Sequence, residues 1–280
     1  MLTRSIYKAL LRAPDLPGKS RLMAPLRRSI LKPDLTAVSS GVLMELDFRE
    51  WVQNKLYRWG SAEPLTMALY EEVLRPGDVY FDVGAHVGFH ALVARSFVGA
   101  AGLVVAVEPQ PYCCARLLRN SFYNGFHNLI VHVAAAGATE GLVELHDQPV
   151  TDRSRLSLPR PGVDGANARS TAGGQSFVVP VRRLDNLMRS HAITSVRLLK
   201  VDTEGYELEV LKGLGAAIAA VDHLVLEVLP DQDARLTEEV ASLLMCHGFT
   251  LRDLHGAAWT PGAPCPEDNV WATRREAPRP

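Results

Sequence analysis

From residue 79 onward, short continuous apolar runs alternate with longer segments whose apolar residues recur at helical spacing. We predict strands at five of the runs, 79–83, 103–107, 129–133, 196–201 and 224–229. The helical segments that we predict are 87–98, 111–124, 207–220 and 237–247. Continuous apolar strands separated by helices are typical of a parallel sheet that is buried on both faces. Because crossover connections are right-handed, the pattern predicts a doubly wound α/β sheet.

Two further patterns complete the predicted architecture. Residues 249–254 and 269–273 have the character of two closing strands. Residues 151–176 are rich in Arg, Gly, Ser and Pro and poor in apolar residues, which predicts a long exposed loop insertion. The segments 142–146 and 177–181 flank this loop, and we expect them to pair as a hairpin.

The amino-terminal segment differs from the rest in charge. Residues 1–32 carry eight Lys or Arg side chains and a single acid, Asp15. One interpretation is a surface that contacts anionic lipid, giving a peripheral membrane contact through the basic amino terminus. The other interpretation, which we favour, is a solvated extension that packs on the core.

Composition excludes several classes of protein. A length of 280 residues suits one domain with short appendages. Lys and Arg number 30 against 31 Asp and Glu, and this balance argues against a nucleic-acid partner. The longest mainly apolar uncharged stretch, 96–107, is too short to cross a bilayer, which takes roughly 20 residues. The four cysteines lack Cys-x-x-Cys spacing, and residues 1–12 lack the apolar core of a signal peptide. We therefore expect reduced thiols and a cytoplasmic protein.

A glycine turn follows the first predicted strand. The strand ends with Asp82 and Val83, and Gly84 and Gly88 bracket a tight turn into the next helix. Glycine lets the backbone approach a ligand closely and adopt dihedral angles that are closed to other residues. The spacing is Gly-x-x-x-Gly, so the Gly-x-Gly-x-x-Gly fingerprint of NAD enzymes is not met. An acid before the turn suits a ligand with a cationic end, although helix capping would also explain Asp82.

A second acid stands at the tip of the next strand. Glu108 lies about 20 residues after Gly88, at the separation at which a carboxylate accepts both hydroxyls of a ribose. The alternative interpretation of Glu108 is a surface salt bridge. Together, the turn and the distant acid predict a nucleotide-type site.

Four motifs in this chain resemble those of the FkbM-type methyltransferases. They are DVGAHVGF at 82–89, VEPQP at 107–111, LDN at 184–186 and LKVDTEGYE at 199–207, and the resemblance covers roughly 78–230. It implies an enzyme that uses S-adenosylmethionine and has the class I methyltransferase Rossmann-like fold, with a mostly parallel sheet flanked by helices. We accordingly divide the chain into a basic extension, 1–60, and a methyltransferase domain, 61–280.

The resemblance also implies roles for individual residues. Asp82, Gly84 and Gly88 would surround the methionine and ribose of the cofactor, and Glu108 would bind the ribose hydroxyls. The adenine would lie near Ala134 and Ala135, beyond the third strand. This chain has His86 at the position in the glycine turn where the family usually has Asn.

An acidic block follows the fourth predicted strand. Asp202 and Glu204 stand at its carboxyl end, where ligands bind in open parallel sheets, so we predict them as the catalytic residues. Glu207 and Glu209 fall in the first helical turn, where the helix dipole alone favours acids. Glu227 lies near the end of the next strand.

Two mechanisms remain open for this block. A carboxylate could remove the proton of a hydroxyl acceptor, or Asp202, Glu204 and Glu227 could hold a divalent cation that lowers the pKa of that hydroxyl. His90 and His223 are further candidate bases.

The leading functional prediction is an S-adenosylmethionine-dependent O-methyltransferase. The resemblance implies that it acts on a small-molecule or carbohydrate acceptor, through a hydroxyl of a sugar, glycolipid or natural product. An NAD-dependent oxidoreductase and a non-catalytic binding module on the same fold are the alternatives. The missing pyrophosphate fingerprint argues against the former, and the joint presence of Asp82, Glu108, Asp202 and Glu204 argues against the latter.

Overall fold

The computed structural model describes residues 34–47, 50–146, 176–228 and 234–274. It also describes seven isolated positions of the amino-terminal segment: Ile6, Tyr7, Ala9, Leu10, Ala13, Lys19 and Met23. Most of the basic segment 1–32 and the predicted loop 151–176, apart from Ser176, therefore lie outside the described residues. Within the described ranges, no helix is both long enough and apolar enough to pass through a bilayer.

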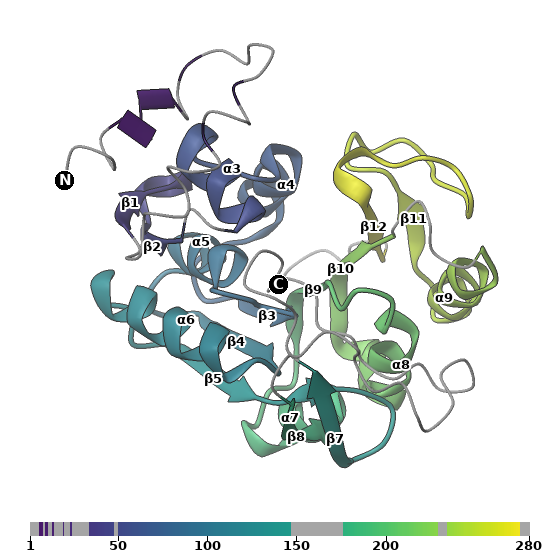
Figure 1. Cartoon of the computed structure of the whole chain (residues 1–280). Helices are drawn as coiled ribbons and strands as arrows, with labels where there is room; N and C mark the ends of the chain where they lie inside the picture. The colour runs from purple at the N-terminus through teal and green to yellow at the C-terminus, as the bar shows by residue number, and fades with distance from the viewer. Residues whose placement is uncertain are drawn as a thin grey trace.

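A seven-stranded sheet forms the centre of the molecule (Figure 1). Its strand order is β11-β12-β10-β9-β3-β4-β5. The bounds are β3 Val79–Val83, β4 Leu103–Glu108, β5 Leu129–Val133, β9 Val196–Val201, β10 Val221–Glu227, β11 Thr250–Arg252 and β12 Asn269–Thr273. The five strands from β10 to β5 run parallel, and β12 pairs antiparallel with both β10 and β11. The predicted doubly wound, mostly parallel sheet is confirmed.

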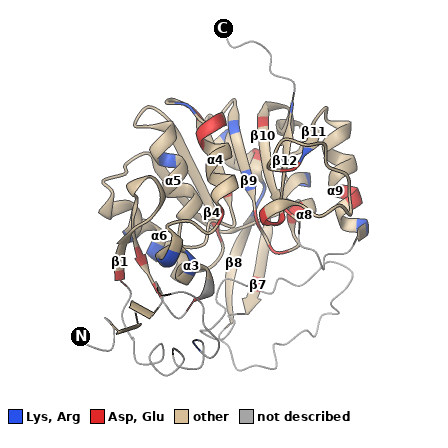
Figure 2. Ribbon diagram, turned by 90° about the horizontal axis from the view of Figure 1, so that it is seen from above, with Lys and Arg blue, Asp and Glu red and all other residues tan. Residues whose placement is uncertain are grey.

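Helices cover both faces of this sheet, and Figure 2 shows the two layers on either side of it. One face carries α3 Trp51–Trp59, α4 Pro64–Val73, α5 Phe89–Val98 and α6 Pro111–Tyr123. The other carries α7 Leu184–Ser190, α8 Glu207–Lys212 and α9 Ala234–Cys246. Each central strand contributes to both cores, as Tyr80 packs in the first and Phe81 in the second. This double burial explains why the strands are continuously apolar.

Several predicted elements have different bounds in the structure, among them β10, α8 and α9. The strand predicted at 224–229 is β10, which begins at Val221 and ends at Glu227. The helix predicted at 207–220 is wrong as one element, because α8 ends at Lys212 and a 3-10 helix, η2, spans Gly215–Ala220. A Cβ on Gly213 would lie 2.3 Å from the carbonyl oxygen of Gly137, so the chain needs glycine where α8 stops.

A three-stranded sheet lies beyond β5. Its strands are β6 Ala135–Ala136, β7 Gly141–His146 and β8 Ser176–Arg182, in the order β6-β8-β7. The predicted hairpin is confirmed as the antiparallel pair of β7 and β8. The parallel pairing of β6 with β8 joins this hairpin to the chain leaving β5.

Residues 34–60 pack on the helical layer of α5 and α6. They form the hairpin of β1 Asp34–Ala37 and β2 Leu43–Leu46, with the short 3-10 helix η1 Ser39–Gly41 between its strands, and then α3. Met44 and Leu46 are fully buried in the same core as Tyr80. Asn120 of α6 accepts a hydrogen bond from the backbone N–H of Glu45, which ties this hairpin to the sheet's helical layer.

Candidate active site

Acids that follow or end neighbouring strands meet at one edge of the sheet. Val83 is paired in register with Val107 on one side and with Val201 on the other. Glu108 and Asp202, the next residues along these strands, therefore flank the end of β3. Leu226 is paired with Val201, so Glu227 lies beside Asp202. Parallel strands place their carboxyl ends together, and the sequence prediction of a common site rested on this property.

The glycine turn packs directly against the backbone of Asp202. The backbone φ angles of Gly84 and Gly88 are +85° and +91°. A Cβ on Gly84 would lie 1.7 Å from the carbonyl oxygen of Asp202, and one on Gly88 would lie 2.6 Å from Cγ of Leu117. The turn therefore requires both glycines because of the protein's own atoms. Their contact with a cofactor stays a prediction.

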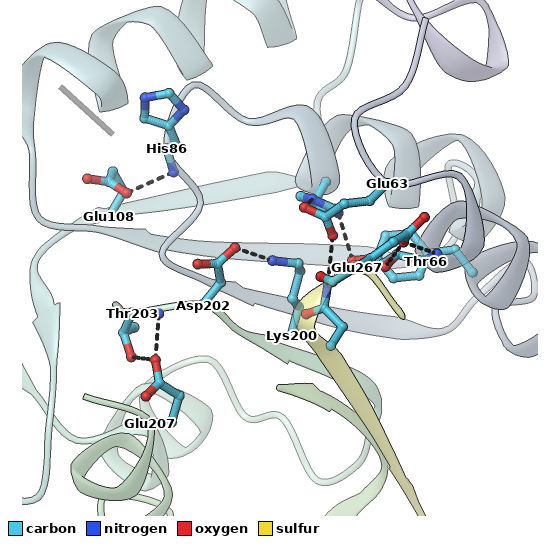
Figure 3. Close-up of polar contacts among 12 residues, drawn as sticks. Glu63, Thr66, His86, Glu108, Lys200, Asp202, Thr203, Glu207 and Glu267 are labelled. Atoms are coloured by element: carbon cyan, nitrogen blue, oxygen red, sulfur yellow. Dashed lines mark hydrogen bonds and ion pairs between the residues drawn. The ribbon is translucent and has the colours of Figure 1, made fainter. Parts of the chain in front are cut away.

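Glu108 is a buried carboxylate that holds the glycine turn. It accepts a hydrogen bond of 2.8 Å from the backbone N–H of His86, as Figure 3 shows. It accepts a second, also of 2.8 Å, from the backbone N–H of Gln110. Burial raises the pKa of Glu108 to about 7, although both hydrogen bonds act in the opposite direction. Because its side chain is buried, the alternative of a surface salt bridge is wrong.

Asp82 combines a capping contact with an oxygen atom that lacks a partner. Its carboxylate accepts a hydrogen bond from the backbone N–H of Ala91, in the first turn of α5, so the capping interpretation describes part of its role. Its Oδ2 atom is buried and has no hydrogen-bond partner among the described residues. Burial raises the pKa of Asp82, whereas the positive charges of His90 and Lys200 lower it. An unpartnered carboxylate oxygen at the glycine turn fits a ligand with a cationic end.

The segment after β5 lies beside Glu108. The backbone N–H of Ala134 donates to the carbonyl oxygen of Glu108 at 3.1 Å. Ala135 begins β6, and its side chain packs with Leu145 and Val179 of the small sheet. The predicted adenine neighbourhood is therefore next to the predicted ribose acid, while the methyl group of Ala135 itself is buried.

The structure brings Asp202, Glu204 and Glu227 together. Burial, together with the negative charges of Asp202 and Glu204, raises the pKa of Glu227 to about 10. Glu227 also makes a side-chain hydrogen bond with Asp202. Glu204 occupies a left-handed backbone position in the loop after β9, with φ +55°. Glu227 therefore carries a proton at neutral pH, next to the Asp202 carboxylate.

The predicted divalent cation is not supported. No group of three or more His, Cys, Asp or Glu side chains in the described part of the chain is arranged to hold a metal ion. Nζ of Lys200 lies 2.5 Å from Oδ2 of Asp202, so an ammonium already provides the positive charge beside this carboxylate.

Glu207 has a more specific role than the helix dipole gives it. Its Oε1 atom accepts hydrogen bonds from the backbone N–H and the hydroxyl of Thr203 and from the backbone N–H of Gly205. It thereby clamps the loop that carries Asp202 and Glu204, as Figure 3 shows for Thr203. Glu209 lies on the exposed side of α8 and pairs with Lys212 at 2.7 Å.

The histidines named from the sequence face other partners. Nδ1 of His90 lies 3.0 Å from the Tyr70 hydroxyl, and Nε2 lies 3.4 Å from Glu63. His223 stacks on Trp271. It lies four residues before the end of β10, which is about 13 Å along the strand. Neither position supports a role as the base at the strand ends.

The His86 ring faces Glu50, whose carboxylate lies 3.6 Å from Nε2. Burial and the nearby charge of Arg116 lower the pKa of His86 to about 4, so its ring is neutral near pH 7. Its backbone N–H is the group that meets Glu108.

Replacing Glu227 with glutamine should stabilise the protein at neutral pH. Because its pKa is higher in the folded chain, folding favours the protonated form of Glu227. Its contribution to the free energy of unfolding is complete below the unfolded pKa of 4.5 and is lost as the pH rises toward 10. At pH 7 the lost free energy of unfolding is about 3 kcal/mol, and the neutral glutamine avoids this loss. Urea unfolding from pH 4.5 to 8 measures the gain, which should vanish at the acidic end. Glu209→Gln is the matched control, and an equal gain in both variants would contradict this prediction.

Comparison with known proteins agrees with this geometry. Residues 82–251 match the Methyltransferase FkbM domain. Hexuronic acid methyltransferase AglP of Haloferax volcanii is 28% identical over 184 residues, which cover 62% of this chain and 70% of that protein. The 31-O-demethyl-FK506 methyltransferase FkbM of Streptomyces tacrolimicus is 30% identical over 200 residues, covering 64% and 75%. A crystal structure of the FkbM methyltransferase of Methylobacillus flagellatus aligns with a TM-score of 0.45 and 16% identity, covering 97% of this chain and 59% of that one.

The protein is thus an S-adenosylmethionine-dependent methyltransferase with the class I Rossmann-like fold, as the sequence predicted. The domain match spans more than half of the chain, and the chain belongs to the FkbM methyltransferase family.

Proposed function

We propose that this protein transfers a methyl group from S-adenosylmethionine to a hydroxyl group of a sugar, glycolipid or natural product. The observation that carries the proposal is the close packing of the glycine turn against the Asp202 backbone, where a Cβ added to Gly84 would lie 1.7 Å from the Asp202 carbonyl oxygen. This contact puts a partly exposed carboxylate next to the turn on which the family binds its cofactor. The relatives named above methylate a hexuronic acid and a demethylated FK506, and their names favour an oxygen acceptor.

The chain's own residues would hold the cofactor at the strand ends. S-adenosylmethionine supplies an electrophilic methyl group on a sulfonium centre. Glu108 already accepts one hydrogen bond at each oxygen, and each oxygen keeps a lone pair that can accept a ribose hydroxyl. The unpartnered Oδ2 of Asp82 would accept from, or pair with, the positively charged part of the ligand.

Asp202 is the residue that we assign as general base. One of its oxygens is held by Lys200, and 29% of its side chain is exposed. Its carboxylate can therefore take the proton of an acceptor hydroxyl as that oxygen becomes the nucleophile. Glu204, in the same clamped loop, is the second acid of the site.

Release of S-adenosylhomocysteine tests the function directly. The enzyme is incubated with S-adenosylmethionine and a panel of acceptors, among them uronic acids, neutral sugars and macrolides with free hydroxyls. We expect release above background with at least one hydroxyl acceptor, and a product whose new methyl group is bonded to oxygen by mass spectrometry and NMR. A product methylated on nitrogen or carbon would contradict the proposal. Thermal shift with S-adenosylmethionine and with NAD separates the oxidoreductase alternative.

Glu108→Ala should weaken S-adenosylmethionine binding by about 1.5–3 kcal/mol, the range of a hydrogen bond to a charged group. The affinity then falls by roughly 10- to 150-fold. Isothermal titration calorimetry measures the change, and circular dichroism establishes that the variant is folded. Glu209→Ala, on the exposed side of α8, is the control that should bind normally. Unchanged affinity in a folded Glu108→Ala variant would remove Glu108 from the ribose role.

A further inference from the structure

Lys200 is a fully buried lysine at the centre of the sheet. Its side chain is 1% exposed, and in register it stands between Asp82 of β3 and Val225 of β10. Lysine is almost never buried to this extent unless its charge is paired. The sequence motif singled out this residue, and the proposed chemistry has so far given it no role.

The Lys200 ammonium lies among negative groups from three elements. Nζ donates to Oδ2 of Asp202 at 2.5 Å. Glu63 at the start of α4 and Asp82 of β3 also face it electrostatically, as does the Tyr70 hydroxyl. Burial lowers the pKa of Lys200, but these partners together raise it well above its usual value. Lys200 therefore stays cationic across the working pH range.

Glu63 fixes this arrangement from the side away from Asp202. Its carboxylate lies 3.4 Å from Nε2 of His90 and accepts a hydrogen bond from Nδ2 of Asn269 at 3.0 Å. Burial raises the pKa of Glu63, but the charges of His90 and Lys200 hold it well below its usual range. In Figure 3, Lys200 lies between Asp202 and the group of Glu63, Thr66 and Glu267. Glu63, which faces the ammonium electrostatically, is therefore itself held by His90 of α5 and Asn269 of β12.

Lys200 and Asp202 differ sharply in how much of each side chain is exposed. The ammonium end belongs to the core, whereas 29% of the Asp202 side chain is exposed at the strand edge. Glu207 clamps the backbone of the loop that begins at Asp202. Lys200 adds a charged constraint on the side chain itself, beside the hydrogen bond between Asp202 and Glu227.

We infer that Lys200 is a positioning residue, whose buried ammonium fixes the Asp202 carboxylate in the orientation that receives the proton of the acceptor hydroxyl. The inference rests on the proposed function, because it concerns the same carboxylate. A misplacement of about 1 Å at a reacting group can cost roughly 100-fold in rate, so this constraint has a measurable consequence.

The charges around Asp202 make the ammonium of Lys200 distinctive. Five described groups interact electrostatically with Asp202: the acids Asp82, Glu108 and Glu227, the neutral His86, and Lys200. Lys200 is the cation of this described set, so removing its charge removes the attractive partner that holds the carboxylate.

The test compares Lys200→Met with a matched control, Glu267→Gln. Glu267 accepts hydrogen bonds from the backbone N–H groups of Leu65 and Thr66 and from the Thr66 hydroxyl, so it holds the same end of α4 through bonds to α4 itself. We expect both variants to unfold at lower temperature. Only Lys200→Met should lose kcat, by about 100-fold, with KM for S-adenosylmethionine nearly unchanged.

Lys200→Arg keeps the test decisive where Lys200→Met does not fold. Arginine retains the charge but presents a longer planar fork, so it should misplace the carboxylate and kcat should fall as well. Wild-type kcat in a folded Lys200→Met, or in Lys200→Arg where only that variant folds, would overturn the inference.

Asp202→Asn, assayed in parallel, separates the two proposals. If it abolishes turnover while the Lys200 variants keep it, only the positioning role fails. If Asp202→Asn keeps full turnover, the assigned base and the positioning role fail together.

Discussion

Asp202→Asn should lower kcat by about 10²–10⁴, the usual range for loss of a general base. Asparagine keeps the shape of the side chain and can still accept from Lys200, but it cannot take a proton. The affinity for S-adenosylmethionine should change little, because the predicted cofactor residues Asp82 and Glu108 are intact. Single-turnover kinetics and calorimetry measure the two quantities separately.

A control and a second acid make this result interpretable. Asp222 of β10 pairs with Arg197 at 3.3 Å on the same sheet, five residues before the end of β10, and Asp222→Asn should leave kcat unchanged. Glu204→Gln should reduce turnover as well, and the double variant should be far from additive if both acids act as one unit. Normal turnover in Asp202→Asn would mean that the acidic block only stabilises the loop between β9 and α8.

Gly84→Ala should destabilise the fold by about 2–5 kcal/mol. A left-handed backbone angle costs a residue with a Cβ roughly 1–2 kcal/mol, and overpacking adds about 1–3 kcal/mol. Here the added Cβ would lie 1.7 Å from the Asp202 carbonyl oxygen, a backbone atom that cannot rotate away. Denaturant unfolding measures the loss of stability.

Gly77→Ala is the matched control for this effect. Gly77 has φ +95°, and no heavy atom lies within 4 Å of its added Cβ. It should therefore show the dihedral cost alone. Equal losses in the two variants would show that the turn can move away from Asp202, and would contradict the close packing of turn and acid.

The strands were the most predictable part of the fold. The bounds of β3, β5, β9 and β12 agree with the apolar runs in the sequence, and β4 extends one residue further, to Glu108. A strand covered by helices on both faces must be apolar at every position, so its sequence records its limits. Elements with one exposed face give a weaker record, and the sequence did not predict α3, α4 or α7.

The candidate site was predictable to a similar extent. Asp82, Glu108 and Asp202 were singled out because they end or follow apolar runs, and parallel strands bring such ends to one edge. The requirement for glycine at position 84 was expected from a ligand, whereas the structure explains it by the Asp202 backbone. The roles of His90 and His223 could not be separated by sequence, because each depends on an aromatic partner on another element.

The sequence by itself determined the doubly wound sheet, the edge at which its acids gather and the motifs of the family. Only the tertiary structure decided what Lys200 and Glu63 do. They are 137 positions apart (200 − 63). Lys and Glu are residue types that usually lie on the surface, so sequence alone does not indicate that these two are paired. Strand register sets Lys200 beside Asp82, and the packing of α4 against α5 brings Glu63 over it. A local pattern records which faces are buried, but a buried charge is stable only with partners that the folded chain assembles from distant segments.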